Sequence, residues 1–108
     1  MSRITLTEAD KGKTIQVHRG SEIVIHLEEN PTTGYRWAID QTNNTVLAPQ
    51  NPSFSPTPGG GIGAGGTRTF TFIAKQPGIV HLQLKLWREE EGNSSIKDRY
   101  DVTIQVQS

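Results

Sequence analysis

The sequence predicts an all-β protein, an immunoglobulin-like antiparallel β-sandwich of about seven to eight strands. Short segments repeatedly alternate apolar and polar residues, which is the period of a strand with one buried face. Turn signals rich in glycine, proline and asparagine separate these segments, roughly every eight to twelve residues. No long stretch shows the 3.6-residue period of an amphipathic helix, so we expect no helical layer.

The first predicted strands cover residues 14–18 and 22–27, and the Arg19-Gly20 pair separates them. The second of these strands has one face formed by Ile23, Ile25 and Leu27, and another formed by Val24 and His26. After a polar loop, a third strand places three residues on one face: Tyr35, Trp37 and Ile39. Arg36 and Asp40 point away from that face. An inward tryptophan often fills the core of an immunoglobulin-like sandwich.

The second half of the chain contains one irregular region and three more alternating segments. Residues 42–58 hold several prolines, which cannot donate to a β-ladder, so we expect a loop with at most a short edge strand, anchored by Phe54. Residues 69–73 alternate and end at a turn over 76–78. The longest strand, residues 79–87, turns four residues inward: Val80, Leu82, Leu84 and Leu86. Its outward residues are His81, Gln83, Lys85 and Trp87. A charged loop then precedes the last inward face: Tyr100, Val102, Ile104 and Val106.

Length and composition limit the possible functions. At 108 residues we expect a single domain over residues 1–108. The formal net charge is zero, which argues against nucleic-acid or membrane-surface binding, and no apolar run approaches the ~18 residues of a membrane helix. There is no cysteine, so disulfides and thiolate chemistry are excluded. Residues 1–8 lack the apolar segment of a secretory signal, which fits a cytoplasmic protein or a processed secreted or periplasmic form.

The sequence shows no pattern that is typical of an enzyme. The three histidines are scattered without metal-ligand spacing, the serines lack a nucleophile elbow, and residues 89–91 fit a solvated acidic turn. Residues 61–66 match the letters of a dinucleotide-binding motif, but no buried strand precedes them and no helix follows. We therefore expect neither catalysis nor a metal or cofactor.

Residues 30–34, Asn-Pro-Thr-Thr-Gly, predict a stiff, hairpin-like loop. The residue before a proline is pushed towards extended geometry, and Pro31 fixes its own φ near −65°. Gly34 permits the positive φ that Thr32 and Thr33 would resist. A stiff loop on a sheet scaffold loses little ordering entropy on contact, so it suits binding, although an ordinary hairpin turn has the same pattern.

Residues 59–67 form a second unusual stretch, which is rich in glycine. A flexible linker is one interpretation, but a linker between two strands of a small sandwich is unexpected. The alternative is a backbone surface, because a main chain without side chains can approach a partner closely and hydrogen-bond along it.

These two stretches together carry a resemblance. Residues 30–35, followed by Arg36 and Trp37, resemble the first binding loop of the chagasin family of inhibitors of papain-like cysteine peptidases, and residues 59–67 match its glycine-rich second loop. The similarity covers nearly the whole chain. It implies an immunoglobulin-like sandwich that is a reversible, competitive inhibitor, monomeric when free, with cathepsin L-like peptidases as partners and no cofactor.

In the family, the first loop enters the cleft beside the catalytic cysteine, the second follows the unprimed side and a third touches the primed side. The resemblance then implies these peptidase-binding residues: Asn30, Pro31, Thr32, Thr33, Gly34, Tyr35, Gly60, Gly61, Ile62, Gly63, Ala64, Gly65, Gly66, Thr67, Trp87 and Arg88.

The third loop departs from the family pattern, which is Arg-Pro-Trp. Arg88 matches the arginine, but Glu89 and Glu90 stand where proline and tryptophan are expected, and Trp87 is a displaced candidate for the missing ring. The alternative function is a non-enzymatic adhesion or carbohydrate-binding module, which would need a platform of exposed aromatic rings. A small hydrolase ranks third, because no nucleophile–base pair is present.

Overall fold

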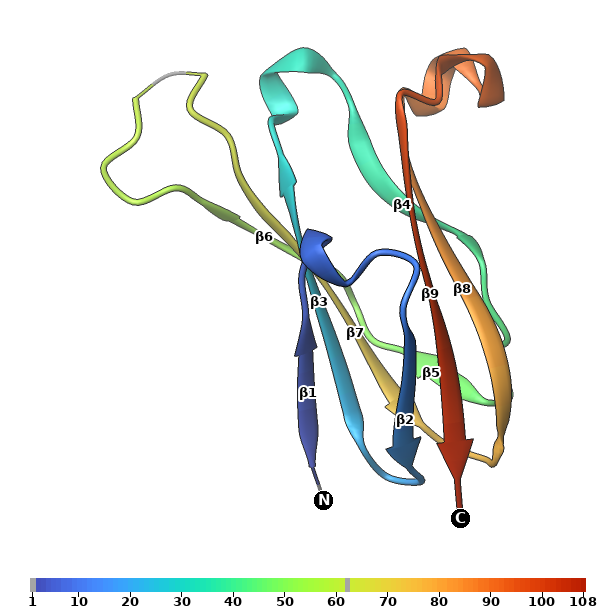
Figure 1. Ribbon diagram of the computed structural model, residues 1–108. Helices are drawn as coiled ribbons and strands as arrows, with labels where there is room; N and C mark the ends of the chain where they lie inside the picture. Colours follow the sequence, from blue (N-terminus) through green and yellow to red (C-terminus); the bar gives the residue numbers. More distant parts are fainter. Residues whose placement is uncertain (1, 62) are drawn as a thin grey trace.

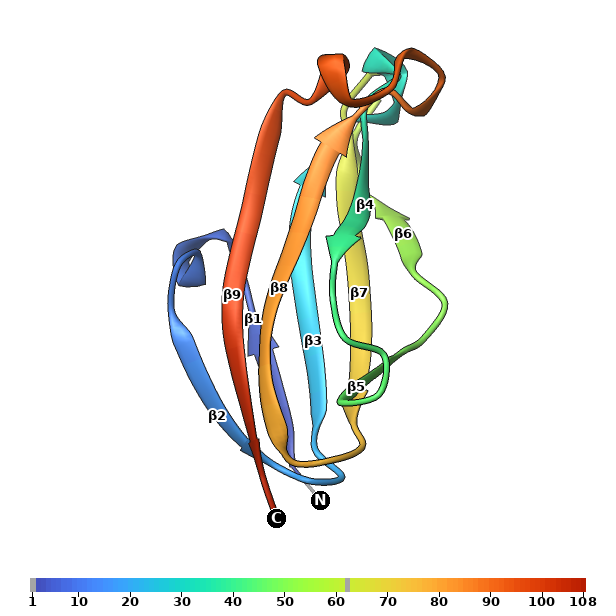
Figure 2. The same cartoon turned by 90° about the vertical axis from the view of Figure 1, so that its right-hand side faces the viewer.

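The computed structural model describes residues 2–61 and 63–108, and folds them into two β-sheets packed face to face (Figure 1, Figure 2). This described part contains nine strands: β1 (Arg3–Leu6), β2 (Thr14–His18), β3 (Glu22–Glu29), β4 (Arg36–Gln41), β5 (Leu47–Pro49), β6 (Ser53–Pro56), β7 (Gly66–Ala74), β8 (Gly78–Trp87) and β9 (Asp98–Gln107). It also contains four 3₁₀ turns: η1 (Glu8–Asp10), η2 (Pro31–Thr33), η3 (Glu89–Glu91) and η4 (Asn93–Ser95).

The two sheets have the strand orders β1-β3-β7-β5, with β6 also paired to β7, and β2-β9-β8-β4. The predicted all-β sandwich is confirmed, but its two sheets are mixed and not antiparallel throughout. β1 runs parallel to β3, and β2 runs parallel to β9. The η1 turn lies between β1, at the edge of one sheet, and β2, at the edge of the other. Because the chain changes sheets here, β1 and β2 do not pair with each other as a hairpin would. A period of two reports which face is buried and not the direction of the neighbouring strand.

The region 42–58 is also more ordered than predicted, since it contains the two short strands β5 and β6. Both pair with β7, β5 near its end at Ala74 and β6 near its start at Gly66. Leu47 is fully buried and holds β5 to the core. Phe54 does not join the core cluster; its half-exposed ring instead lies 5.1 Å from the guanidinium carbon of Arg68.

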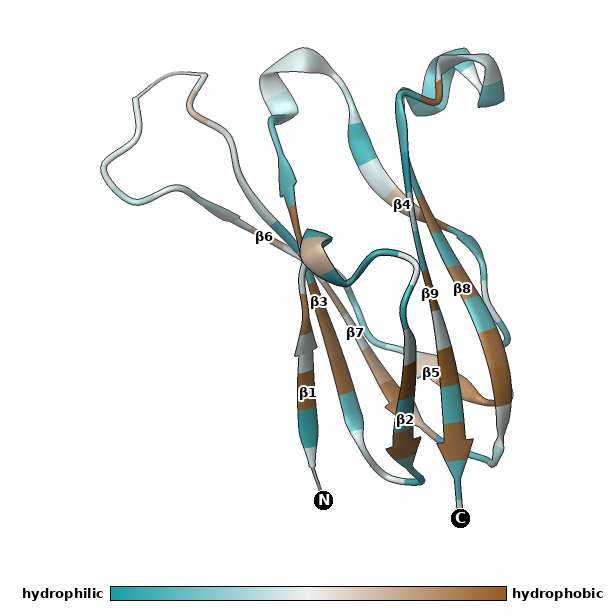
Figure 3. Ribbon diagram, in the orientation of Figure 1, coloured by the Kyte–Doolittle hydropathy of each residue, from teal (hydrophilic) through white to brown (hydrophobic). Residues whose placement is uncertain are grey.

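The core lies between the sheets and is formed by the inward faces that the alternation predicts. Figure 3 shows the corresponding apolar bands along β3, β8 and β9. The predicted inward residues buried here include Ile23, Ile25, Leu27, Trp37, Val80, Leu82, Leu84, Tyr100, Val102, Ile104 and Val106. Burying aliphatic and aromatic side chains contributes roughly 1.5–3 kcal/mol each, so these faces supply most of the driving force for folding.

Tyr100 joins the core to the η1 turn. Its hydroxyl donates a hydrogen bond to the carbonyl oxygen of Thr7 at 2.8 Å. Burial raises the pKa of this phenol to about 12, and the nearby carboxylates of Asp10 and Asp101 act in the same direction. The neutral, hydrogen-bonded form is therefore the one that the fold favours.

The two termini lie together at one end of the sandwich, and the loops β3–β4, β6–β7 and β8–β9 lie at the other (Figure 1, Figure 2). In the described residues, no helix has the length and apolar character that a membrane crossing requires.

Candidate functional site

Three loops meet at the end of the sandwich opposite the termini (Figure 1). We call residues 30–35, between β3 and β4, the first loop. Residues 57–65, between β6 and β7, are the glycine loop, and residues 88–97, between β8 and β9, are the third loop. The sheets place these loops side by side, so the two sequence stretches that the resemblance singled out lie at the same end of the molecule.

The first loop is a 3₁₀ turn held by its own side chains. The Asn30 carboxamide oxygen accepts a hydrogen bond from the Thr32 backbone N–H at 3.1 Å and another from the Thr32 hydroxyl at 2.6 Å. The Thr33 hydroxyl donates to the Asn30 carbonyl oxygen at 2.7 Å. Gly34 ends the turn with φ of +82°. The predicted stiffness therefore has a concrete origin in a capped turn with a left-handed terminus.

The glycine loop contains two tight turns, closed by backbone bonds from Gly60 to Thr57 and from Ala64 to Gly61, both 3.1 Å. Its glycines have different roles. A Cβ at Gly65 would lie 3.1 Å from the Glu29 carbonyl oxygen, and one on Gly66 would lie within van der Waals overlap of β6. A Cβ on Gly61 would meet nothing within 4 Å. Some glycines are thus required by the protein's own packing, whereas Gly61 is free to accept a side chain.

The predicted residues Gly66 and Thr67 are not in the loop, because they begin β7 and pair with β3 and β6. Ile62, also predicted to bind the peptidase, lies outside the described residues.

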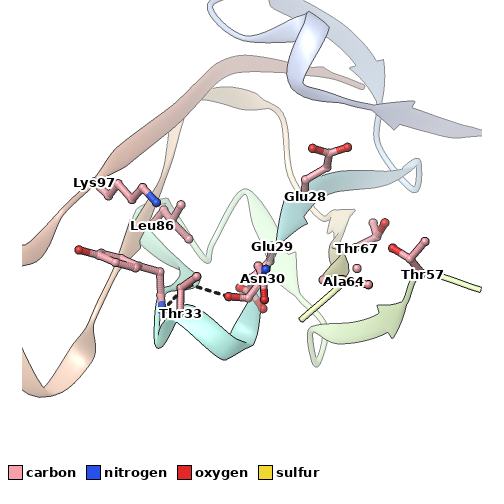
Figure 4. A pocket seen from close by; sticks show the side chains of 12 residues that line it. Glu28, Glu29, Asn30, Thr33, Thr57, Ala64, Thr67, Leu86 and Lys97 are labelled. Atoms are coloured by element: carbon pink, nitrogen blue, oxygen red, sulfur yellow. Dashed lines mark hydrogen bonds between the residues drawn. The ribbon is translucent and has the colours of Figure 1, made fainter. Parts of the chain in front are cut away.

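A hydrogen bond joins the start of the first loop to the glycine loop. The Asn30 side-chain N–H donates to the Gly63 carbonyl oxygen at 2.9 Å. A groove of about 310 Å³ is lined by residues of both loops, and Figure 4 shows Lys97 and Leu86 on one side of it and Thr57 and Thr67 on the other. Lys97 was not predicted; its ammonium nitrogen lies 4.9 Å from the centroid of the Tyr35 ring.

The third loop is joined to the first loop by Arg88. Its guanidinium donates to the Thr33 carbonyl oxygen at 3.0 Å, pairs with Glu91 at 3.3 Å and lies 4.5 Å from the centroid of the Tyr35 ring. Arg88 therefore faces the first loop and is not a freely extended side chain. Arginine suits this position because its planar fork can donate and stack at the same time.

Trp87 lies on the other side of the first loop, across from Arg36 of the neighbouring strand β4. It helps to line a second groove of about 590 Å³, together with Pro31, Glu89 and Glu90. The ammonium nitrogen of Lys85 lies 3.6 Å from the centroid of the Trp87 ring.

Lys85 itself is only 9% exposed, although the alternation places it on the outer face. Its ammonium group pairs with Asp40 at 3.3 Å and donates to the side-chain oxygen of Asn93 in the third loop at 3.1 Å. The base of the third loop is thereby attached to β8.

A buried carboxylate, which was not predicted, lies beneath the first loop and the glycine loop. Glu29 is the last residue of β3, and its side chain is fully buried. One oxygen accepts a hydrogen bond from the Trp37 backbone N–H at 2.6 Å. The other accepts two from Arg68, at 3.0 and 2.5 Å. A signal was present in the sequence, because Glu29 continues the inward phase of Ile23, Ile25 and Leu27.

The described side chains at this end form no cluster that could hold a metal ion: in residues 2–61 and 63–108 no group of three or more histidine, cysteine, aspartate or glutamate side chains is placed to do so. The first loop and the glycine loop are rich in exposed threonine and glycine, and Arg88 pairs with Glu91 within the third loop.

Comparisons with known proteins agree with this description. The model of the chagasin family, peptidase inhibitor I42, matches residues 16–104. Chagasin of Trypanosoma cruzi is 30% identical over 106 residues, which cover 94% of this chain and 96% of the relative.

Two solved structures share the fold. The cysteine protease inhibitor EhICP2 of Entamoeba histolytica matches with a TM-score of 0.86 at 20% identity, over 99% of this chain and 97% of that chain. PbICP-C, solved in complex with falcipain-2, matches with a TM-score of 0.72 at 14% identity, over 99% of this chain and 100% of that chain. The family match spans all three loops, and the family consists of inhibitors and not of enzymes. The chain therefore belongs to the chagasin family of peptidase inhibitors.

Proposed function

We propose that this protein is a reversible, competitive inhibitor of papain-like cysteine peptidases, cathepsin L-like enzymes included, and that it blocks the active-site cleft with its three loops. Membership of the chagasin family supports the class of target. The relative PbICP-C, which has the same fold, forms a complex with falcipain-2.

The proposed mode of binding rests on one observation: hydrogen bonds hold the three loops together. Asn30 bonds to the glycine loop, and Arg88 bonds to the Thr33 carbonyl of the first loop. Three loops that are held together before contact lose little conformational entropy when they bind. Such a surface can occlude a cleft by shape without any chemical step.

Each loop has its own part in this proposal. The first loop, with Thr32 and Thr33 at its tip, enters the cleft beside the catalytic cysteine. The glycine loop lies along the unprimed side, where its backbone can pair with the peptidase main chain. The third loop contacts the primed side with the surface around Trp87 and Arg88. Arg88 also acts within the inhibitor, since it holds the first loop in place.

Resistance to cleavage follows from the shape of the first loop. A peptidase must align an extended peptide with its nucleophile, with the reacting atoms about 3–3.5 Å apart. Here Pro31–Thr33 forms a 3₁₀ turn, and Gly34 has the left-handed φ of +82°. The side-chain bonds of Asn30 and Thr33 would have to break before the loop could extend.

The carbohydrate-binding alternative receives no support from the aromatic side chains at this end. Arg88 and Lys97 lie over Tyr35, and Lys85 lies over Trp87. These contacts occupy ring faces that a sugar platform would leave open.

The test is a titration of the protein against papain and against a cathepsin L-like peptidase, with a peptide substrate at several concentrations. We expect the apparent inhibition constant to rise with substrate concentration, and the inhibitor to be recovered uncleaved. The thiol reagent that keeps such peptidases active should not affect the inhibitor, which has no cysteine. Recovery of a chain cut within residues 30–34 during inhibition would identify a slow substrate instead.

A further inference from the structure

The buried carboxylate of Glu29 occupies a position that joins two binding loops. Its side chain has 0% exposure, whereas that of its partner Arg68 is 19% exposed. A charge placed this deeply needs its hydrogen-bonding capacity filled, because an unpaired buried carboxylate is strongly unfavourable. Glu29 meets this condition with three hydrogen bonds, one on the first oxygen and two on the second.

The first oxygen closes the first loop at its base. Glu29 immediately precedes Asn30, and Trp37 is the second residue of β4 on the far side of the loop. The bond between the Glu29 carboxylate and the Trp37 backbone N–H therefore spans the whole loop. The Trp37 indole N–H adds a second closure by donating to the Glu28 carbonyl oxygen at 2.8 Å.

The second oxygen fixes the base of the glycine loop. Arg68 lies in β7, shortly after that loop, and is directly opposite Phe54 of β6, the strand that leads into the loop. The Arg68 guanidinium bonds to Glu29 and stacks near the Phe54 ring at the same time. The carboxylate thus links β3 directly to β4 and β7, and Arg68 extends the link to β6 through the Phe54 ring.

A gain in folding stability does not by itself explain why Glu29 and Arg68 form a buried ion pair. Removing two charges from water costs several kcal/mol each, and apolar replacements of similar volume are often equally stable or more stable. Such a pair does fix geometry, because a carboxylate oxygen accepts hydrogen bonds only from certain directions. Here the donors to the two Glu29 oxygens lie at the bases of the two loops.

We propose that Glu29 is a positioning residue that sets the placement of the first loop relative to the glycine loop, so that both reach a single peptidase cleft together. The inference rests on the proposed function, since it concerns how the same surface is kept in order. The loops are then joined by two links, the Asn30–Gly63 bond and, one residue earlier in the chain, the Glu29 carboxylate.

The test compares three variants with the wild type. Glu29→Gln keeps the size of the side chain and an acceptor for Trp37 but removes the negative charge. The double variant Glu29→Leu with Arg68→Leu replaces the ion pair with apolar side chains and leaves no unpaired charge. Ile104→Val is the matched control, because Ile104 is a fully buried core residue of β9 that pairs with Val80, away from the loops.

We expect the inhibition constant for papain to rise roughly ten- to a hundredfold in the double variant, because small displacements of preorganised groups have effects of this size. Glu29→Gln should show a smaller rise in the same direction. Ile104→Val should lower the thermal midpoint and leave the inhibition constant near the wild-type value. If both Glu29 variants behave like Ile104→Val, Glu29 is only a structural residue and the proposal is wrong.

A second measurement needs no peptidase. In free Glu29→Gln, amide hydrogen exchange should accelerate at Gly34 and Ala64, whose N–H groups close turns in the two loops, and remain unchanged at Glu91 in the third loop. Unchanged exchange at Gly34 and Ala64 would overturn the proposal, even if the double variant failed to fold. If wild type did not inhibit papain at all, the proposed function would fail, while this exchange experiment would still decide the role of Glu29.

Discussion

Asn30 uses both polar atoms of its side chain to hold the loops in place. Its oxygen accepts two hydrogen bonds from Thr32, which shapes the first loop, and its nitrogen donates to Gly63, which joins that loop to the glycine loop. The two functions depend on different atoms of one carboxamide. Substitutions can therefore separate the local cap from the bridge between loops.

We expect Asn30→Asp to weaken inhibition of papain by a few-fold to about tenfold, because it keeps the acceptor for Thr32 and loses the donor to Gly63, a bond worth about 0.5–1.5 kcal/mol. Asn30→Ala should weaken inhibition further, since it also removes a cap worth about 0.5–2 kcal/mol. Inhibition constants for both variants check the order. Wild-type inhibition by Asn30→Asp would mean that the bridge to the glycine loop contributes nothing, and equal losses in the two variants would mean that the cap contributes nothing.

Tyr100 gives the protein a pH dependence in alkaline solution. Its pKa is raised from 10.0 to about 12, mainly by burial, so the folded state holds the phenol proton more tightly than the unfolded chain does. The stabilisation is fully present below pH 10 or so, and it is lost as the pH rises through about 12.

We therefore expect the free energy of unfolding of the wild type to fall between about pH 10 and 12 relative to that of Tyr100→Phe, which has no proton to lose. At neutral pH the variant should be less stable by about 1 kcal/mol, the typical net value of the lost hydrogen bond to Thr7. Urea unfolding of both proteins at several pH values measures the difference. A constant difference across the alkaline range would contradict the role given to the phenol.

At the scale of elements, the sequence was most informative where a strand is central in its sheet. The inward residues of β8 and β9 follow the period of two, because one face of each strand packs on the core. β5 has only three residues, too few to show a period, and β6 is bounded by proline. The sequence therefore predicts only a loop with at most a short edge strand here, whereas the structure has two strands and buries Leu47 fully.

The candidate site also has features that the sequence predicts and features that it does not. The turn of the first loop was predictable, because Asn30, Pro31 and Gly34 act through local backbone preferences. The contacts between loops were not, since the bonds from Asn30 to Gly63 and from Arg88 to Thr33 join residues 33 and 55 positions apart. Local sequence carries no signal for such pairs.

Gly61 allows the role of the glycine loop to be tested with little effect on the fold. Gly61 has no positive φ, and an added Cβ would meet nothing within 4 Å. Gly61→Ala should leave the thermal midpoint unchanged. If the backbone of this loop lies along a peptidase cleft, the extra methyl group should still weaken inhibition, by roughly tenfold for each 1.4 kcal/mol lost.

Gly63→Ala should have a larger effect on inhibition, because Gly63 has φ of +84°, where a side chain costs about 1–2 kcal/mol. Gly12→Ala is its matched control. Gly12 has φ of +82° and open space around its Cβ position, but it lies in the turn that leads into β2. It should be destabilised to a similar extent without loss of inhibition. Wild-type inhibition by Gly61→Ala and Gly63→Ala would remove the glycine loop from the interface.

At the scale of the whole molecule, the sandwich keeps the chain termini apart from the three loops. The described part of the chain extends over 45 × 33 × 23 Å, with both termini at one end and the three loops at the other (Figure 1). The strands between them are tied to a continuous core. A bulky addition at either terminus should therefore be held away from a partner bound at the loops.

This geometry predicts the effect of fusions. A folded domain attached through a short flexible linker at Ser2 or Ser108 should leave the inhibition constant for papain within about twofold, since no binding contact is lost. The same domain inserted between Asn93 and Ser94 of the third loop should weaken inhibition strongly, because it would stand beside the first loop and would also disturb the bond from Lys85 to Asn93. Inhibition constants and thermal midpoints of the three fusions decide the matter. Strong inhibition by the third-loop insertion would mean that the first loop and the glycine loop suffice, and that the departure of Glu89 and Glu90 from the family pattern has little cost for binding.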